Sequence, residues 1–169
     1  IVDGYEDGWT GPIHGQWGPI SYRAQTRKGR LYLFFRVTDD TVNYHDPRIT
    51  THATGDRLIL RTGNGASFVI ASAGPGPVQA RLLENGRVQR WESRIRGQWQ
   101  DTMDGFTLEL EMPLELAANR LGFYLVNVSG SSSTTHGNIE PRNHALPPWL
   151  VYSSNKLQSL VKPFAAGEL

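Results

Sequence analysis

Two glutamates on one expected strand could act together as a pair of catalytic carboxyl groups. Glu109 and Glu111 lie two positions apart in the segment FTLELEMP, and alternate residues of a strand point to the same face. Glycoside hydrolysis uses two carboxyl groups about 5 to 9.5 Å apart, so the spacing permits that reaction. Alternating glutamates are also typical of the solvent face of a half-buried strand. We therefore expect both to point into solvent or to pair with arginines.

Other catalytic patterns are missing from the sequence. It has no G-x-S-x-G, H-E-x-x-H, P-loop or dinucleotide fingerprint. It has no cysteine, which excludes a disulfide framework, a thiolate zinc site and a cysteine nucleophile. The five histidines fall in expected turns or loops, and only His45 and His52 have even a weak ligand-like spacing. We expect this domain not to be an enzyme, whether or not the full-length protein carries a kinase or a glycoside hydrolase.

Aspartates are concentrated in the first third of the chain, in expected loops and near strand ends. Calcium favours several carboxylate and carbonyl oxygens supplied by loops. The candidate calcium ligands are Asp3, Asp39 and Asp56. Two observations favour a plainer role: an Asp before a Gly is first of all a turn former, and the chain lacks a dense D-x-D-x-D loop.

A long unpatterned segment, residues 129–148, is the expected position of a binding surface, because long loops on rigid sheets often carry function. Trp149 follows it and offers a flat aromatic face that could stack on a sugar ring, with Tyr152 on the same side of an extended segment. Residues that could add hydrogen bonds there are Arg142, Asn143 and His144. Trp99, in a polar hairpin, is a further candidate ligand-binding aromatic. Alternatively, Trp149 closes the fold over its core.

The segments around these candidate residues have the pattern of β-strands. Short segments alternate apolar and polar residues, and Gly or Pro interrupts the chain about every ten residues. Asn85-Gly86 is a strong signal for a type I′ hairpin turn. We predict an all-β fold with little helix, an antiparallel, jelly-roll-like sandwich of two sheets. The predicted core residues are Leu31, Leu33, Phe35, Val37, Leu58, Leu60, Phe68, Ile70, Phe106, Leu108, Leu110, Phe123 and Leu125.

Composition limits the organisation and the partners. A chain of 169 residues fits one domain, so residues 1–169 are expected to form a single unit, with 153–169 as a C-terminal connector. The formal net charge of +1 gives no bulk attraction to nucleic acid, and nucleic acid is not an expected partner. No apolar run approaches the roughly 20 residues that a membrane-spanning helix needs.

Four segments taken in order carry a resemblance: IVDGYEDGW, RLYLFFRVTDD, GDRLILRT and DGFTLELEMPLELA. As a set they resemble the family-9 carbohydrate-binding modules and their DOMON-like relatives. The resemblance implies a β-sandwich with structural calcium and a sugar clamped between two tryptophans beside a Glu and an Arg. In this chain Ala53, Ile59 and Val69 stand at three of those four positions, and only Trp149 matches the late aromatic.

The resemblance therefore suggests a scaffold for binding without the known sugar site. We expect a non-catalytic ligand-recognition domain, most simply the extracytoplasmic sensor domain of a bacterial signal-transduction histidine kinase with a membrane-anchored parent chain. The alternative is a carbohydrate-binding module appended to a polysaccharide-degrading enzyme. The expected partner is a small molecule, a glycan or a periplasmic protein.

Overall fold

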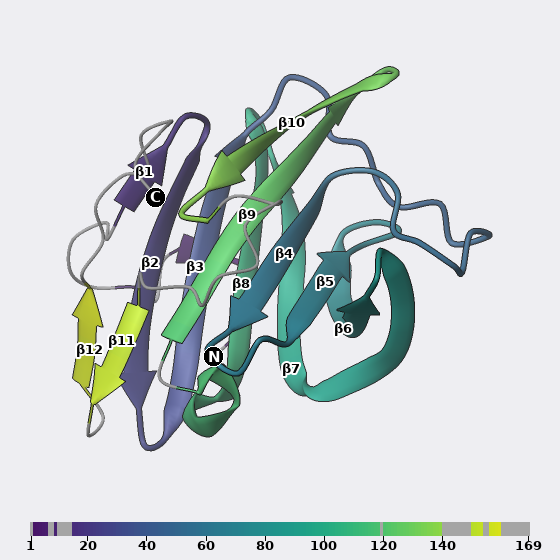
Figure 1. Cartoon of the computed structure of the whole chain (residues 1–169). Helices are drawn as coiled ribbons and strands as arrows, with labels where there is room; N and C mark the ends of the chain where they lie inside the picture. The colour runs from purple at the N-terminus through teal and green to yellow at the C-terminus, as the bar shows by residue number, and fades with distance from the viewer. Residues whose placement is uncertain are drawn as a thin grey trace.

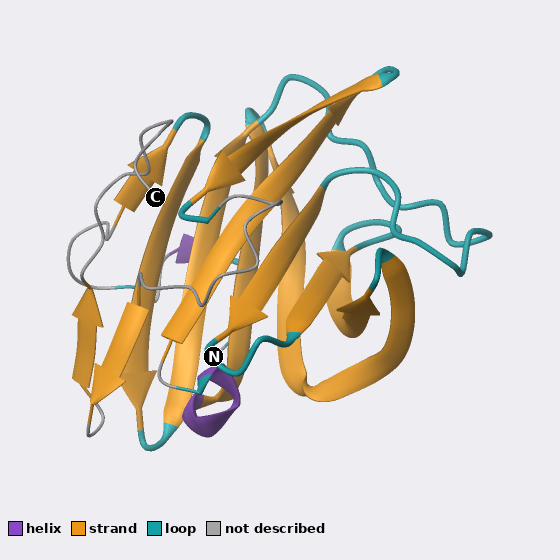
Figure 2. Cartoon of the chain, in the orientation of Figure 1, coloured by secondary structure: helices purple, strands orange, loops and turns teal. Residues whose placement is uncertain are grey.

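The computed structural model describes residues 2–6, 9, 15–118, 120–139, 150–153 and 156–159. These residues form antiparallel strands and a single-turn 3-10 helix, η2 (Leu114–Ala117), with no α-helix among them (Figure 2). None of the described helices is long and apolar enough to cross a membrane. The strands are β1 (Gly15–Trp17), β2 (Ile20–Arg27), β3 (Arg30–Thr38), β4 (Arg57–Thr62), β5 (Ser67–Ala71), β6 (Gly76–Glu84), β7 (Arg87–Thr102), β8 (Gly105–Pro113), β9 (Arg120–Ser129), β10 (Ser132–Gly137), β11 (Leu150–Ser153) and β12 (Lys156–Ser159).

All these strands belong to one curled sheet (Figure 1). Its order is β1-β2-β3-β8-β7-β6-β5-β4-β9-β11-β12, with β10 also paired to β9, and every pairing is antiparallel. The prediction of an antiparallel, almost wholly β fold is confirmed. The hydrogen-bond ladder forms one continuous sheet and does not divide into two.

The main core lies inside the curl. Strand alternation places one set of side chains there, and all thirteen predicted core residues are buried. They come from β3 and β8 on one side and from β4, β5 and β9 on the other. Full burial of one such side chain stabilises the fold by about 1.5–3 kcal/mol. The period-two pattern thus predicted this face of the sheet correctly.

The β6–β7 hairpin is sharply bent. Its turn is Asn85-Gly86, where both residues have the positive φ values that a type I′ turn requires (51° and 76°). Further along, Gln79 pairs with Arg96 while Arg81 pairs with Trp91, so β7 contains extra residues between the two pairs. Extra residues on one strand bend a hairpin. The bent hairpin curls over the outer face of β5 (Figure 1).

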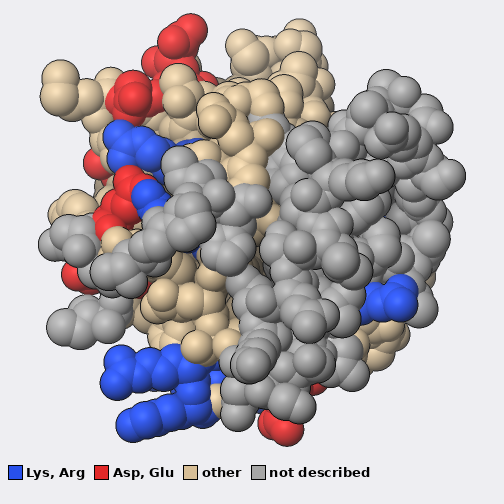
Figure 3. All heavy atoms as spheres, turned by 90° about the vertical axis from the view of Figure 1, so that its left-hand side faces the viewer, with Lys and Arg blue, Asp and Glu red and all other residues tan. Residues whose placement is uncertain are grey.

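Charges of both signs occur on the described surface. The face that carries β1 shows Lys and Arg side chains together with Asp and Glu side chains (Figure 3). This mixture agrees with the near-neutral net charge.

Candidate ligand-binding cavity

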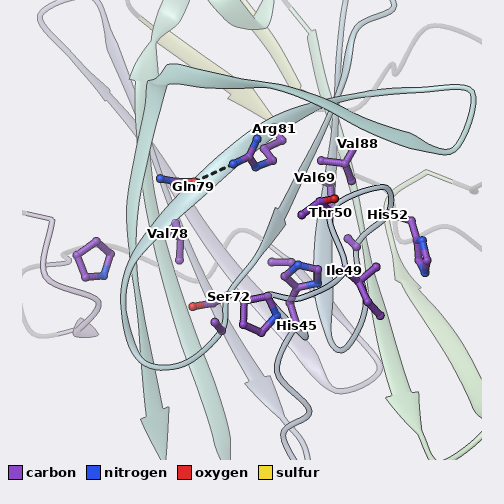
Figure 4. A pocket seen from close by; sticks show the side chains of 15 residues that line it. His45, Ile49, Thr50, His52, Val69, Ser72, Val78, Gln79, Arg81 and Val88 are labelled. Atoms are coloured by element: carbon purple, nitrogen blue, oxygen red, sulfur yellow. Dashed lines mark hydrogen bonds between the residues drawn. The ribbon is translucent and has the colours of Figure 1, made fainter.

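A cavity of about 440 Å³ lies on the outer face of the sheet, between the β3–β4 connection and the β6–β7 hairpin (Figure 4). The connection contributes His45, Ile49 and His52. Strands β5 to β7 contribute the remaining wall, including Val69, Arg81 and Val88. The full lining is His45, Pro47, Ile49, Thr50, His52, Ala53, Val69, Ala71, Ser72, Ala73, Pro77, Val78, Gln79, Arg81 and Val88.

The floor is apolar because β5 places Val69 and Ala71 on the outer face of the sheet. The neighbouring strand β4 has one apolar residue on that face, Ile59, between Arg57 and Arg61. In β5, Phe68 and Ile70 enter the main core, and Val69 between them points outward into a second buried cluster with Ile59, Tyr124 and Val126. Strands buried on both faces read as continuous apolar runs. The segments LIL in β4 and FVI in β5 are such runs. These runs indicate that part of the outer face of the sheet is also apolar and must be covered by another segment of the chain.

Backbone hydrogen bonds hold the β3–β4 connection over this floor. The N–H of His45 donates to the carbonyl oxygen of Ser72 at 2.8 Å, and the N–H of Val88 donates to the carbonyl oxygen of Thr51 at 3.0 Å. The connection re-enters β4 through Gly55, which has a φ of +73°. A Cβ atom there would lie 2.6 Å from the carbonyl oxygen of Asn43, so this tight turn requires glycine.

Two polar side chains of the lining, His45 and Arg81, present hydrogen-bond donors. The N–H of Thr54 donates to Nδ1 of His45 at 3.0 Å. Nδ1 is therefore the unprotonated nitrogen of the neutral ring, and Nε2 carries the hydrogen. Arg81 is exposed and donates to Oε1 of Gln79 at 3.3 Å and to the carbonyl oxygen of Gln89 at 3.4 Å. Arg81 forms no ion pair with a described residue, and the described lining contains no Asp or Glu.

The three positions where the resemblance places sugar-binding residues also converge on this region. Ala53 and Val69 line the cavity, and Ile59 lies beside Val69 in the pairing of β4 with β5. All three side chains are apolar here. These three residues therefore contribute only apolar surface to this region, and the binding surface expected at residues 129–148 and Trp149 is a different part of the chain.

Two of the three candidate calcium ligands lie together at one end of the core. Asp56 is buried, and its carboxylate accepts the N–H of Val128 at 2.8 Å and the N–H of Asn43 at 2.9 Å. Burial raises the pKa of Asp56 to about 6, and the neighbouring carboxyl of Asp39 adds to this rise while the two backbone donors oppose it. Oδ2 of Asp39 and Oδ1 of Asn127 are buried without a hydrogen-bond partner among the described residues.

Asp3, the third candidate, is held at a different place. Its backbone N–H donates to Glu109, and its carbonyl oxygen accepts a hydrogen bond from Gln100. Among the described residues there is no group of three or more His, Cys, Asp or Glu side chains arranged to hold a metal. Any cation at Asp39 and Asp56 would take its other ligands from amide or backbone carbonyl oxygens or from water.

The two glutamates of β8 have different surroundings. Glu111 pairs with Arg30 at 3.5 Å and with Arg96, as expected. Glu109 is buried, and the expectation that it points into solvent or pairs with an arginine is wrong. Its Oε2 accepts the N–H groups of Asp3 and Gly4, because the N-terminal segment covers the outer face of β8. Burial raises the pKa of Glu109, and these two hydrogen bonds partly offset the rise.

The aromatic candidates do not gather at one described site. Trp99 lies in the core with no exposed area, stacked on Phe106 with ring centroids 4.1 Å apart, so the structure does not support its expected role as a surface platform. Alternation along Gln98-Trp99-Gln100 is the signal that predicts its burial. Arg142, Asn143, His144 and Trp149 lie outside the described residues, and Tyr152 is placed only as a member of β11, opposite Leu157.

Trp91 is exposed, with 52% of its surface accessible. It borders a second and more open hollow, which also contains Tyr32, Gln98 and Arg96. Comparison with known proteins gives no assignment for either hollow: no protein-family model, curated protein or solved structure matches the chain.

Proposed function

We propose that this chain is a non-catalytic ligand-recognition domain and that the cavity between the β3–β4 connection and the β6–β7 hairpin is its binding site. The observation that carries the proposal is the cavity itself, about 440 Å³ with an apolar floor and a few fixed polar groups. Small-molecule sites are typically concavities of this size and lining. The carboxylates that could suggest hydrolysis support this view, since Glu109 is bonded to backbone and Glu111 to arginines.

Within this class we propose the extracytoplasmic input domain of a membrane-anchored bacterial sensor histidine kinase. A jelly-roll-like sandwich belongs to the same proposal: β2, β3 and β8 face β4, β5 and β9 across the main core. A small-molecule cavity fits a sensor input better than a module that holds a polysaccharide chain. A carbohydrate-binding module attached to a hydrolase is the alternative, and a periplasmic protein is the alternative partner. Transmembrane segments or a hydrolase domain in the full-length sequence would distinguish the first two.

A structural calcium ion at Asp39 and Asp56 is a second proposal. Two carboxyl groups lie side by side there, and two buried oxygens, Oδ2 of Asp39 and Oδ1 of Asn127, lack donors among the described residues. Buried acceptors without donors are costly unless a proton or a cation satisfies them. Carboxylate and amide oxygens are the ligands that calcium prefers. Such an ion would link the end of β3 to the start of β4.

Blocking the cavity tests the main proposal. Thr50 is exposed and lines the cavity, so Thr50→Trp should obstruct it without altering the core. Thr134→Trp, on the exposed face of β10, is the matched control. A small-molecule library would be screened by thermal shift on the wild type and both variants. Ligands that stabilise the wild type and Thr134→Trp but not Thr50→Trp support the proposal, and ligands that stabilise all three equally place the site elsewhere.

A further inference from the structure

We infer that the cavity recognises a small molecule with an apolar body and one carboxylate group, a ligand class that rests on the proposed binding role of the cavity. Three features of the lining lead to this ligand class. An apolar floor lies beside an arginine that has no carboxylate partner among the described residues, and beside a histidine whose free nitrogen is a donor.

The apolar part of the ligand would contact the floor. Val69 is buried there, and Ala53 and Val88, which also line the cavity, pack against the same apolar cluster. Burial of apolar ligand surface is favourable by roughly 25 cal/mol per Å². A cavity of about 440 Å³ lies in the lower half of the range of volumes typical of small-molecule sites.

The charged part of the ligand would be anionic, because the cavity supplies donors and positive charge. Arg81 lies directly opposite Val69 in the pairing of β5 with β6, so its guanidinium belongs to the same face as the floor. Its present acceptors are one amide oxygen and one carbonyl oxygen at 3.3 and 3.4 Å, which are long for hydrogen bonds. A carboxylate would bind the guanidinium through shorter, charge-assisted bonds.

His45 adds a second donor. Its Nδ1 is occupied by the N–H of Thr54, which leaves the Nε2 hydrogen for a ligand. Figure 4 shows Arg81 on β6 and His45 on the connection at separate parts of the cavity wall. One group can therefore bind the carboxylate while the other fixes a second polar atom of the ligand.

A cationic ligand would find no counter-ion in the described lining. That lining holds no Asp or Glu, and the nearest acid in sequence, Asp46, is bound by Arg48 at 2.8 and 3.0 Å. Arg57 is paired with Ala71 of the lining, but it donates to the carbonyl oxygen of Gly55 and interacts with the carboxyl group of Asp56. The unpaired charge in the described lining of the cavity is therefore that of Arg81. Uncompensated positive charge selects anions over neutral isosteres and cations.

The test compares two probes that differ in one group, 3-phenylpropionate and 3-phenylpropionamide, by calorimetric titration of the whole chain. We expect the acid to bind at least about tenfold more tightly than the amide, the minimum that a charge-assisted contact provides. Arg81→Gln should remove this difference. Arg87→Gln, an exposed arginine of the same hairpin outside the lining, should keep it.

Each outcome is informative. Equal affinity for acid and amide, with both lost in Thr50→Trp, overturns the ligand class and leaves the cavity as the site. If the acid still binds to both Thr50→Trp and Arg81→Gln, the cavity is not the binding site and the proposed ligand class is wrong as well. Absence of binding by either probe at millimolar concentration overturns the ligand class. A preference for the acid that persists in Arg81→Gln also contradicts the role given to Arg81.

Discussion

Oε2 of Glu109 accepts the backbone N–H of Gly4 at 2.9 Å, across 105 positions of sequence. The same atom accepts the N–H of Asp3 at 3.0 Å, and Oγ1 of Thr107 donates to the carbonyl oxygen of Gly4. These bonds fix the N-terminal segment to the outer face of β8. Gly4 has a φ of +86°, and a Cβ atom there would lie 2.6 Å from Cγ of Gln100, which explains the glycine in this opening segment.

Replacing Glu109 should loosen this attachment. Glu109→Leu leaves the N–H groups of Asp3 and Gly4 without an acceptor, and we expect a loss of about 1–3 kcal/mol in the free energy of unfolding. Glu109→Gln keeps an oxygen and should lose less. Urea denaturation measures both. Glu111→Gln removes two ion pairs to partly exposed arginines but keeps a side-chain oxygen that can accept from both, and we expect it to lower stability by about 1 kcal/mol or less. If Glu109→Leu proves as stable as the wild type, the proposed attachment is contradicted.

Leu110 points the opposite way from Glu109 and is fully buried in the main core. Leu110→Ala should lower the free energy of unfolding by about 2–5 kcal/mol, since it leaves a cavity in close-packed surroundings. Chemical denaturation followed by tryptophan fluorescence gives the value. A loss below about 1 kcal/mol would show that the site collapses or is not core.

Trp99 and Trp91 form a matched pair on β7. Trp99 is buried and stacks on Phe106, whereas half of Trp91 is exposed. We expect Trp99→Ala to cost about 3–5 kcal/mol and Trp91→Ala to change stability by about 0.5 kcal/mol or less. Thermal unfolding of both variants checks the contrast. The reverse order would place the wrong tryptophan in the core.

The raised pKa of Asp56 predicts a pH dependence of stability. Its ordinary pKa is 3.8, and in the folded chain it is about 6, so the folded state keeps a proton that the unfolded chain has released. Stability from this group is present below pH 3.8 and is lost as the pH rises through about 6. With a chelator present, the wild type should lose more stability between about pH 5 and about pH 7.5 than Asp56→Asn does. Equal pH slopes for the two proteins would contradict this.

Calcium should raise the melting temperature of the wild type if it binds at Asp39 and Asp56. Stabilisation grows with free calcium and reaches about 2.7 kcal/mol at a hundredfold excess over the dissociation constant. EDTA should reverse it, and Asp39→Asn and Asp56→Asn should each abolish it. Asp46→Asn, at an aspartate that pairs with Arg48, is the control. A calcium effect that survives Asp56→Asn would exclude this position.

The sequence predicts the main core well and the outer face poorly, for a physical reason. Alternation at Leu31, Leu33 and Phe35 identifies the buried face of β3. Asn85-Gly86 predicts the type I′ turn between β6 and β7. Alternation does not say what covers the opposite face. Glu109 is buried by a segment about a hundred residues distant, and no local pattern encodes such a contact.

The candidate site could likewise be predicted only in part from the sequence. Apolar runs in β4 and β5 indicate a second apolar face, but the cavity above it depends on how residues 42–55 fold back, and that segment has no periodicity. Its path is set by particular bonds such as His45 to Ser72. The predicted surface at Trp149 and its neighbours lies outside the described residues and stays a prediction.

The connection over the cavity is attached to the sheet through isolated hydrogen bonds, such as those of His45 and Val88, and not through a strand ladder. Residues 46–54 make few of these bonds to the sheet, whereas Val42 and Tyr44 before them pack against the main core and stay with it. Segments held in this way open at a small fraction of the cost of global unfolding, and their amide hydrogens exchange early. We therefore expect the amide hydrogens of residues 46–54 to exchange before those of the sheet beneath them, so that the roof of the cavity can open to a ligand while the sheet stays folded.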